Sequence, residues 1–139
     1  MDNKRMKSIV TIGIVLNKKG EVLIVRRRYP ESLNKGGYLE WVFPGGVQED
    51  NESREERVVK EILLETGYKT NVIRQIHFRI HPDTFIPIIY FLCSLESEEP
   101  VQEIIEKDEI AEVKWVMPSE LFNYFQSNLD PEVKKVLNI

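Results

Sequence analysis

Short runs of apolar, β-branched residues recur along the chain, separated by turns rich in glycine and charge, and they predict a strand-rich fold. Residues 8–16 and 21–28 predict a hairpin, because Asn17 to Gly20 between them is typical of a turn. The almost wholly apolar run 84–95 predicts a central strand, with Pro87 near its start or at an edge or bulge. Further strands are expected at 39–43, 71–80 and 113–117, a loop at 29–37, and helices at 118–125 and from Asp130 onward.

The best-defined helix is predicted at residues 54–66, directly after an acidic loop. Ser53 is a favourable N-cap, and Glu56 three residues later completes a capping-box pattern. Gly67 is suited to the C-terminal end, because a left-handed cap costs glycine little. One side of the helix is apolar at helical spacing and is expected to face the core: Val58, Val59, Ile62, Leu63 and Thr66.

Another side of this helix carries two acidic residues one turn apart, Glu61 and Glu65. Adjacent carboxylates with no cation between them on the helix repel each other. A divalent ion such as Mg²⁺ would relieve the repulsion, because hard ions prefer oxygen ligands. Glu52, just before the helix, is placed to approach the same point. For the glutamate pair alone, a solvated acidic face is the alternative interpretation, since surface helices commonly carry such charges.

The stretch Gly46 to Tyr68 resembles the Nudix box, G-x5-E-x7-R-E-U-x-E-E-x-G-U, in which U is a bulky apolar residue. The positions that match are Gly46, Glu52, Glu61, Ile62, Glu65 and Gly67. Lys60 replaces the family's arginine, which keeps the charge but loses the planar fork that fixes a carboxylate. Leu64 replaces the first glutamate of the E-E pair and removes one candidate metal ligand, and Tyr68 is a loose match to the last apolar position.

The resemblance covers about residues 8–126 and implies an α/β fold, the Nudix α/β/α sandwich with a mixed sheet and the box helix packed on it. One Nudix-like domain is expected over residues 1–139. The resemblance also implies a hydrolase that uses Mg²⁺ or Mn²⁺ to cleave the pyrophosphate link of a nucleoside diphosphate derivative. A nucleoside triphosphate, an ADP-ribose-type molecule and a nucleotide sugar remain open as substrates, and so does a homodimer.

By the same resemblance, the expected metal ligands are Glu61, Glu65, Glu52 and Glu109, the last of which comes from a loop outside the box. The candidate catalytic residues are Glu61, Glu65 and Glu109, and either Glu61 or Glu109 would take the proton from water. Substrate contacts are expected from Arg27, Gly45, Gly46 and Lys60. Glu112 competes with Glu109 for the role from the loop, and a plain acidic surface loop is the simpler alternative.

The departures at Lys60 and Leu64 support a second hypothesis, a catalytically impaired Nudix-like module that binds a nucleotide or a partner and regulates without turnover. Replacing a fork with a point charge and removing a carboxylate both weaken a metal site. Because Glu52, Glu61, Glu65 and the glycines are retained, hydrolysis is the preferred interpretation.

Composition narrows the classes of function. With a net charge of −4, nucleic-acid binding is not expected, because that usually requires a basic surface. A small anionic substrate is compatible if a metal supplies the positive charge locally. No apolar run reaches the length of a membrane span, so no membrane partner is expected. Cys93, the only cysteine, excludes an internal disulfide, which fits the cytoplasm, and is expected to pack in the core.

Overall fold

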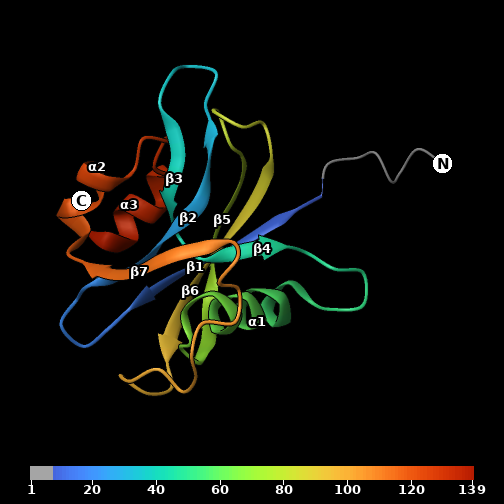
Figure 1. The fold of residues 1–139 in the computed structure, drawn as a ribbon, viewed down its shortest axis with the longest axis vertical. Coiled ribbons are helices and arrows are strands. Elements are labelled where there is room, and N and C mark those ends of the chain that lie inside the picture. The colour runs from blue at the N-terminus through green and yellow to red at the C-terminus, as the bar shows by residue number, and fades with distance from the viewer. Residues whose placement is uncertain (1–7) are drawn as a thin grey trace.

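The computed structural model describes residues 8–139, which form one mixed sheet with helices packed on it (Figure 1). The strands are β1 (Val10–Leu16), β2 (Val22–Ser32), β3 (Tyr38–Val42), β4 (Gly45–Val47), β5 (Thr70–Ile80), β6 (Pro87–Leu95) and β7 (Ile110–Val116). The helices are α1 (Arg54–Thr66), α2 (Leu121–Tyr124) and α3 (Pro131–Leu137), with a 3₁₀ turn at Pro118–Glu120.

The strand β6 lies in the interior of the sheet, parallel to β1 on one side and antiparallel to β5 on the other. The order along the sheet is β3-β2-β1-β6-β5, while β4 pairs with β1 and β7 pairs with β2. The predicted central position of the apolar run is therefore confirmed, and the strand starts at Pro87, where the missing N–H removes no ladder bond inside the strand.

Both faces of the sheet are covered, because consecutive residues of a strand point to opposite sides. On β2, Leu23 packs with Val58 and Ile62 of α1, whereas its neighbour Ile24 packs with Val133 of α3. All of these side chains are fully buried. Figure 1 shows α1 well apart from the pair α2 and α3. The arrangement is the α/β/α sandwich expected from the sequence.

The helix α1 begins and ends where the sequence predicts. The Ser53 hydroxyl accepts a hydrogen bond from the Glu56 N–H, and the Glu56 carboxylate accepts one from the Ser53 N–H. Gly67 has a φ of 81° and donates its N–H to the Leu63 carbonyl. These local hydrogen bonds fix the limits of the helix without help from the rest of the fold.

Several strand limits differ from the prediction: β6 starts at Pro87 instead of residue 84, and β7 at Ile110 instead of residue 113. The strand β2 continues to Ser32 instead of ending at residue 28, because Glu31 and Ser32 pair with β3 after a register shift that follows Arg26. Part of the predicted loop 29–37 is therefore strand. The short β4 was not predicted, and it forms because Gly45 and Gly46 pair with β1.

The segment 118–125 is also less regular than expected, since a 3₁₀ turn precedes the single turn of α2. The predicted last helix is confirmed as α3, with Asp130 as its N-cap. Cys93 is buried, as predicted, and its burial raises the pKa of the thiol to about 12. None of the helices within residues 8–139 is long and apolar enough to cross a membrane.

Candidate active site

The glycines of β4 place the two box carboxylates against the sheet. The Gly45 N–H donates to Glu65 Oε1 at 3.1 Å, and the Gly46 carbonyl accepts a hydrogen bond from the Thr11 hydroxyl at 3.1 Å. A Cβ atom at Gly46 would lie 2.6 Å from Cγ of Glu61 and 2.7 Å from its Oε1. Glycine at position 46 leaves the Glu61 side chain in the space that a Cβ would otherwise fill.

Both box glutamates lie in an environment that disfavours their negative charge. Burial raises the pKa of Glu65 to about 8, opposed by the Gly45 hydrogen bond and reinforced by the charges of Glu61, Glu109 and Glu106. Burial also raises the pKa of Glu61, and here the nearby Arg57 guanidinium opposes the rise. Two desolvated carboxylates of this kind are a frequent feature of functional sites.

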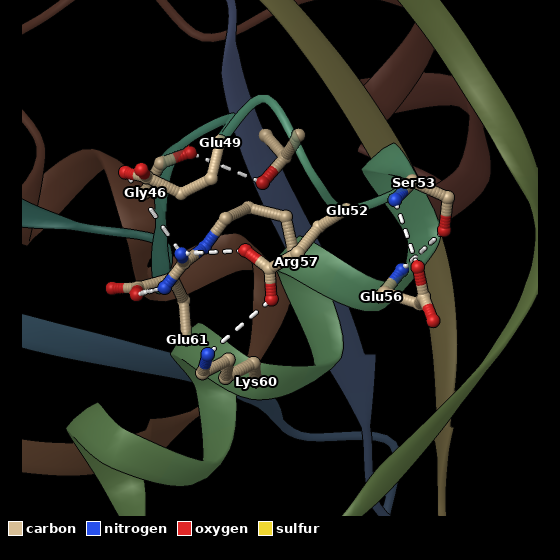
Figure 2. A network of polar contacts seen from close by, with 9 residues as sticks. Gly46, Glu49, Glu52, Ser53, Glu56, Arg57, Lys60 and Glu61 are labelled. Carbon is tan, nitrogen blue, oxygen red and sulfur yellow. Dashed lines mark hydrogen bonds and ion pairs between the residues drawn. The ribbon is translucent and has the colours of Figure 1, made fainter.

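An ion-pair network that the sequence analysis did not anticipate surrounds Glu61 (Figure 2). The Arg57 side chain, only 9% exposed, donates to Glu52 Oε1 at 2.9 Å and also to Glu61 Oε2. Lys60 contacts Glu52 Oε2 at 3.3 Å. Lys60, a predicted substrate contact, therefore points to Glu52 and not to the cavity described below, and a cation does lie beside Glu61, contributed from the preceding turn of α1.

The acidic loop before β7 is attached to the last turn of α1. The N–H groups of Ile105 and Glu106 both donate to the Leu64 carbonyl, at 2.9 and 3.0 Å. A hydrogen bond with Glu109 raises the pKa of Glu106, and the charges of Glu109 and Glu61 raise it further. The structure thus brings the loop acids Glu109 and Glu106 beside the box carboxylates, at the helical turn that lacks the family's glutamate.

The competing loop residue Glu112 does not join this group. It accepts a hydrogen bond from Nε of Arg26 at 3.2 Å, across the β2–β7 pair. Of the two loop candidates from the sequence, only Glu109 lies close enough to raise the pKa of Glu61 and Glu65.

A cavity of about 410 Å³ opens beside these acids. Its wall includes Gly45, Gly46, Glu65 and Glu109, with Arg27 also on it, and apolar side chains make up most of the remainder. Arg27 donates to Glu31 at 3.2 Å, so its charge is partly compensated within β2. Glu61 lies directly behind Gly46 and does not line the cavity itself.

The donors at this site are oxygen atoms of carboxylates and backbone carbonyls, which suit a hard divalent ion and not a soft one. Within residues 8–139, no three histidine, cysteine or acidic side chains converge as a ready-made metal centre. The Glu61 carboxylate is instead turned onto Arg57. Glu61, Glu65 and Glu109 are the acids that the fold gathers, and Glu52 is joined to them through Arg57.

Sequence reasoning missed Arg57 and Glu106. Arg57 precedes Glu61 by four residues, which is a favourable spacing for an ion pair on a helix and was a readable signal. Glu106 lies three residues before Glu109 in the acid-rich segment, but only the hydrogen bonds to Leu64 show where this loop returns.

Comparison with known proteins gives consistent results. Residues 6–137 match the NUDIX domain family. The chain is 34% identical over 115 residues to Nudix hydrolase 6 of Arabidopsis thaliana, covering 80% of this chain but only 39% of that protein. It is 32% identical over 96 residues to the 8-oxo-dGTP diphosphatase of Proteus vulgaris, covering 68% and 80% of the two chains.

Solved structures share the architecture. An ADP-ribose pyrophosphatase from Streptococcus suis superposes with a TM-score of 0.62 at 18% identity, covering 95% of this chain and 89% of that one. At 18% identity this similarity supports a shared fold and nothing further.

Proposed function

We propose that this chain, which belongs to the NUDIX family, is a hydrolase. It would use Mg²⁺ or Mn²⁺ to cleave the pyrophosphate bond of a nucleoside diphosphate derivative. The observation that carries the proposal is the gathering of Glu61, Glu65 and Glu109 around Gly45 and Gly46 of β4, beside a cavity of about 410 Å³. Similar proteins are named for 8-oxo-dGTP and for ADP-ribose, so the substrate class is set no more narrowly than this.

Each part of the site has a task in this reaction. Glu61, Glu65 and Glu109 would hold the divalent ion, which when bound neutralises phosphate charge and lowers the pKa of a coordinated water. Gly45 and Gly46 let the phosphate chain pass close to the backbone of β4. Arg27, on the wall of the cavity, supplies a guanidinium to a phosphate oxygen once it releases Glu31.

The bond changes are those of a hydrolysis. A water oxygen attacks one phosphorus, the bridging P–O bond breaks, and the bridging oxygen leaves with the other phosphate. The water's proton passes to a carboxylate, for which Glu61 and Glu109 are the candidates. Glu109 lines the cavity, and Glu61 lies behind Gly46 in its wall. The apolar part of the cavity receives the base or the group that the diphosphate carries.

Glu106 is a further acid for the same ion. The missing carboxylate at Leu64 leaves room in the ligand set, and the backbone of Glu106 is hydrogen-bonded to the carbonyl of that very residue. Its side chain lies beside Glu109, so that one loop contributes two acids next to the turn that lacks one.

The test is a panel of nucleoside triphosphates, nucleotide sugars and dinucleotides incubated with Mg²⁺ or Mn²⁺, with products identified by mass. We expect Glu61→Gln and Glu65→Gln each to lower the rate by about 100-fold or more, since each removes charge at the reacting centre. Glu55→Gln is the matched control, because Glu55 is an exposed residue of the same helix. Unchanged turnover in both site variants would remove the proposal.

The alternative function, nucleotide binding without turnover, is favoured by one observation: Leu64 stands at the box position where the family has the first glutamate of the E-E pair. The same panel distinguishes the two functions. A binding module would show saturable nucleotide binding by calorimetry and no product by mass in either metal.

A further inference from the structure

Arg57 is the most deeply placed cation of α1, and it joins two acids of the site. Its side chain is 9% exposed and donates to both Glu52 and Glu61, and Figure 2 shows its guanidinium between their carboxylates. Its Nε is buried without a hydrogen-bond partner. An unpaired buried donor is a cost to folding, so the position of this arginine is not explained by packing alone.

The comparison with Lys60 shows what Arg57 adds. Lys60 stands at the arginine position of the Nudix box, yet its ammonium reaches only Glu52, and its side chain is 56% exposed. An ammonium is a single point of charge, whereas a guanidinium presents donors in a rigid plane and can hold two carboxylates in a fixed relation. Arg57 makes both contacts from one turn earlier on the same helix.

The contact with Arg57 also determines which oxygen of Glu61 is available. Arg57 binds Oε2, while Oε1 lies beside Gly46, where a Cβ would be 2.7 Å away. In the part of the chain that the structure describes, no hydrogen bond to Oε1 occurs. Glu61 is thus held with one oxygen neutralised and the other directed to the wall of the cavity.

We infer that Arg57 is a positioning residue that replaces the arginine fork missing at Lys60 and holds Glu61 ready for the divalent ion. The inference rests on the proposed function. Residues that orient a metal ligand through hydrogen bonds commonly affect metal affinity as much as rate. Arg57 touches no part of the cavity, so its effect passes through Glu61 and Glu52.

The test moves the fork back to the family position. Arg57→Met keeps an unbranched, apolar side chain at this site but removes the ion pairs with Glu52 and Glu61, and the longer one with Glu49. Lys60→Arg is then added to it. The dissociation constant of Mn²⁺ is measured without nucleotide, by electron paramagnetic resonance of the free ion, and kcat and KM are measured separately. Arg54→Met is the matched control, because Arg54 lies exposed on the same helix and donates a hydrogen bond to Gln48.

We expect Arg57→Met to weaken Mn²⁺ binding by about 10–100-fold, the range typical of lost support for a metal ligand. The double variant should recover most of the loss, and Arg54→Met should bind Mn²⁺ as the natural chain does. Arg57→Lys keeps the charge without the fork, and it should resemble Arg57→Met. It also serves if the methionine variant fails to fold.

Three results would overturn the inference. Arg57→Met that binds Mn²⁺ as tightly as the natural chain would show that the guanidinium does not support the site, and tighter binding would show that it repels the ion. Arg57→Lys with full affinity would show that the fork is not needed. If Arg57→Met folds and adding Lys60→Arg does not restore its Mn²⁺ affinity, a guanidinium at position 60 does not replace Arg57. If the natural chain neither bound Mn²⁺ nor hydrolysed any nucleotide, the proposed function itself would be refuted, independently of Arg57.

Discussion

Replacing Gly46 with alanine tests whether the exact place of the Glu61 carboxylate matters. The new Cβ would lie 2.6 Å from Cγ, 2.7 Å from Cδ and 2.7 Å from Oε1 of Glu61. Favourable contacts between heavy atoms lie at about 3.5–4.0 Å. The Glu61 side chain must therefore move by about 1 Å, while the backbone at Gly46, which is not in the left-handed region, accepts alanine.

The expected consequence is a loss of rate with little loss of stability. A displacement of about 1 Å at a reacting group costs on the order of 100-fold in rate. A Gly→Ala change at a compatible backbone position stabilises by about 0.4–1 kcal/mol through the unfolded chain. That gain offsets the weakened contact between Glu61 and Arg57. We expect the melting temperature to change little while kcat falls by about two orders of magnitude.

Gly45→Ala is the matched comparison. There the Cβ would lie 2.0 Å from the Thr11 carbonyl oxygen and 2.9 Å from Cα of Ile12, which are backbone atoms of β1 and cannot turn aside. Overpacking of this kind typically costs about 1–3 kcal/mol, so this variant should melt at a lower temperature. Thermal unfolding and initial rates with Mg²⁺ are measured for both. A Gly46→Ala protein with the natural rate and Mn²⁺ affinity would refute the claim that the exact place of the Glu61 carboxylate matters.

Three further outcomes are expected. Glu106→Gln should weaken Mn²⁺ binding by about tenfold, whereas Glu103→Gln, in an exposed part of the same loop, should leave it unchanged. Leu64→Glu should tighten Mn²⁺ binding and keep or raise the rate, and a loss of both would show that Leu64 is needed for packing. Between pH 9 and 12 the natural chain should lose about 1.4 kcal/mol of stability per pH unit relative to Cys93→Ala, as measured by urea unfolding. The reason is that the unfolded thiol ionises from about pH 9, while burial keeps the folded thiol protonated to about pH 12. Equal dependence of the two unfolding free energies on pH would contradict this.

The helix and the central strand follow from the sequence because their signals are local. Ser53, Glu56 and Gly67 satisfy the backbone groups at the ends of α1 within a few residues of each other, so the limits of the helix need no tertiary information. The apolar run of β6 is likewise specified by its own composition, since a strand buried on both faces is apolar throughout.

The extra strand residues follow from pairing, which the sequence does not display. Glu31 and Ser32 belong to β2 only because Leu39 and Tyr38 lie opposite them after a shift in register. Gly45 and Gly46 are poor strand formers by composition, yet both pair with β1. A Cβ at Gly45 would meet the backbone of Thr11, and one at Gly46 would meet the Glu61 side chain. Partners distant in sequence override local propensity in both cases.

The site shows the same division. The spacing of Glu61 and Glu65 places them on one side of α1 in any helix, and the structure keeps them together. Arg57 was not assigned to the site because an arginine next to an apolar stripe is usually exposed, whereas here it is 9% exposed and paired with two acids. The position of Glu106 near the site depends on the path of its loop, which is fixed by hydrogen bonds to the Leu64 carbonyl.

Both departures from the family box lie next to a residue able to supply what is missing. Lys60 lacks a fork, and Arg57, one turn away, forms one with Glu52 and Glu61. Leu64 lacks a carboxylate, and its own carbonyl binds the loop that carries Glu106. A metal site depends on where charges and oxygens lie in space, and not on which sequence position contributes them. The guanidinium and the carboxylate that the box lacks at positions 60 and 64 are therefore supplied near Glu61 by Arg57 and Glu106. For this reason hydrolysis is favoured over binding alone.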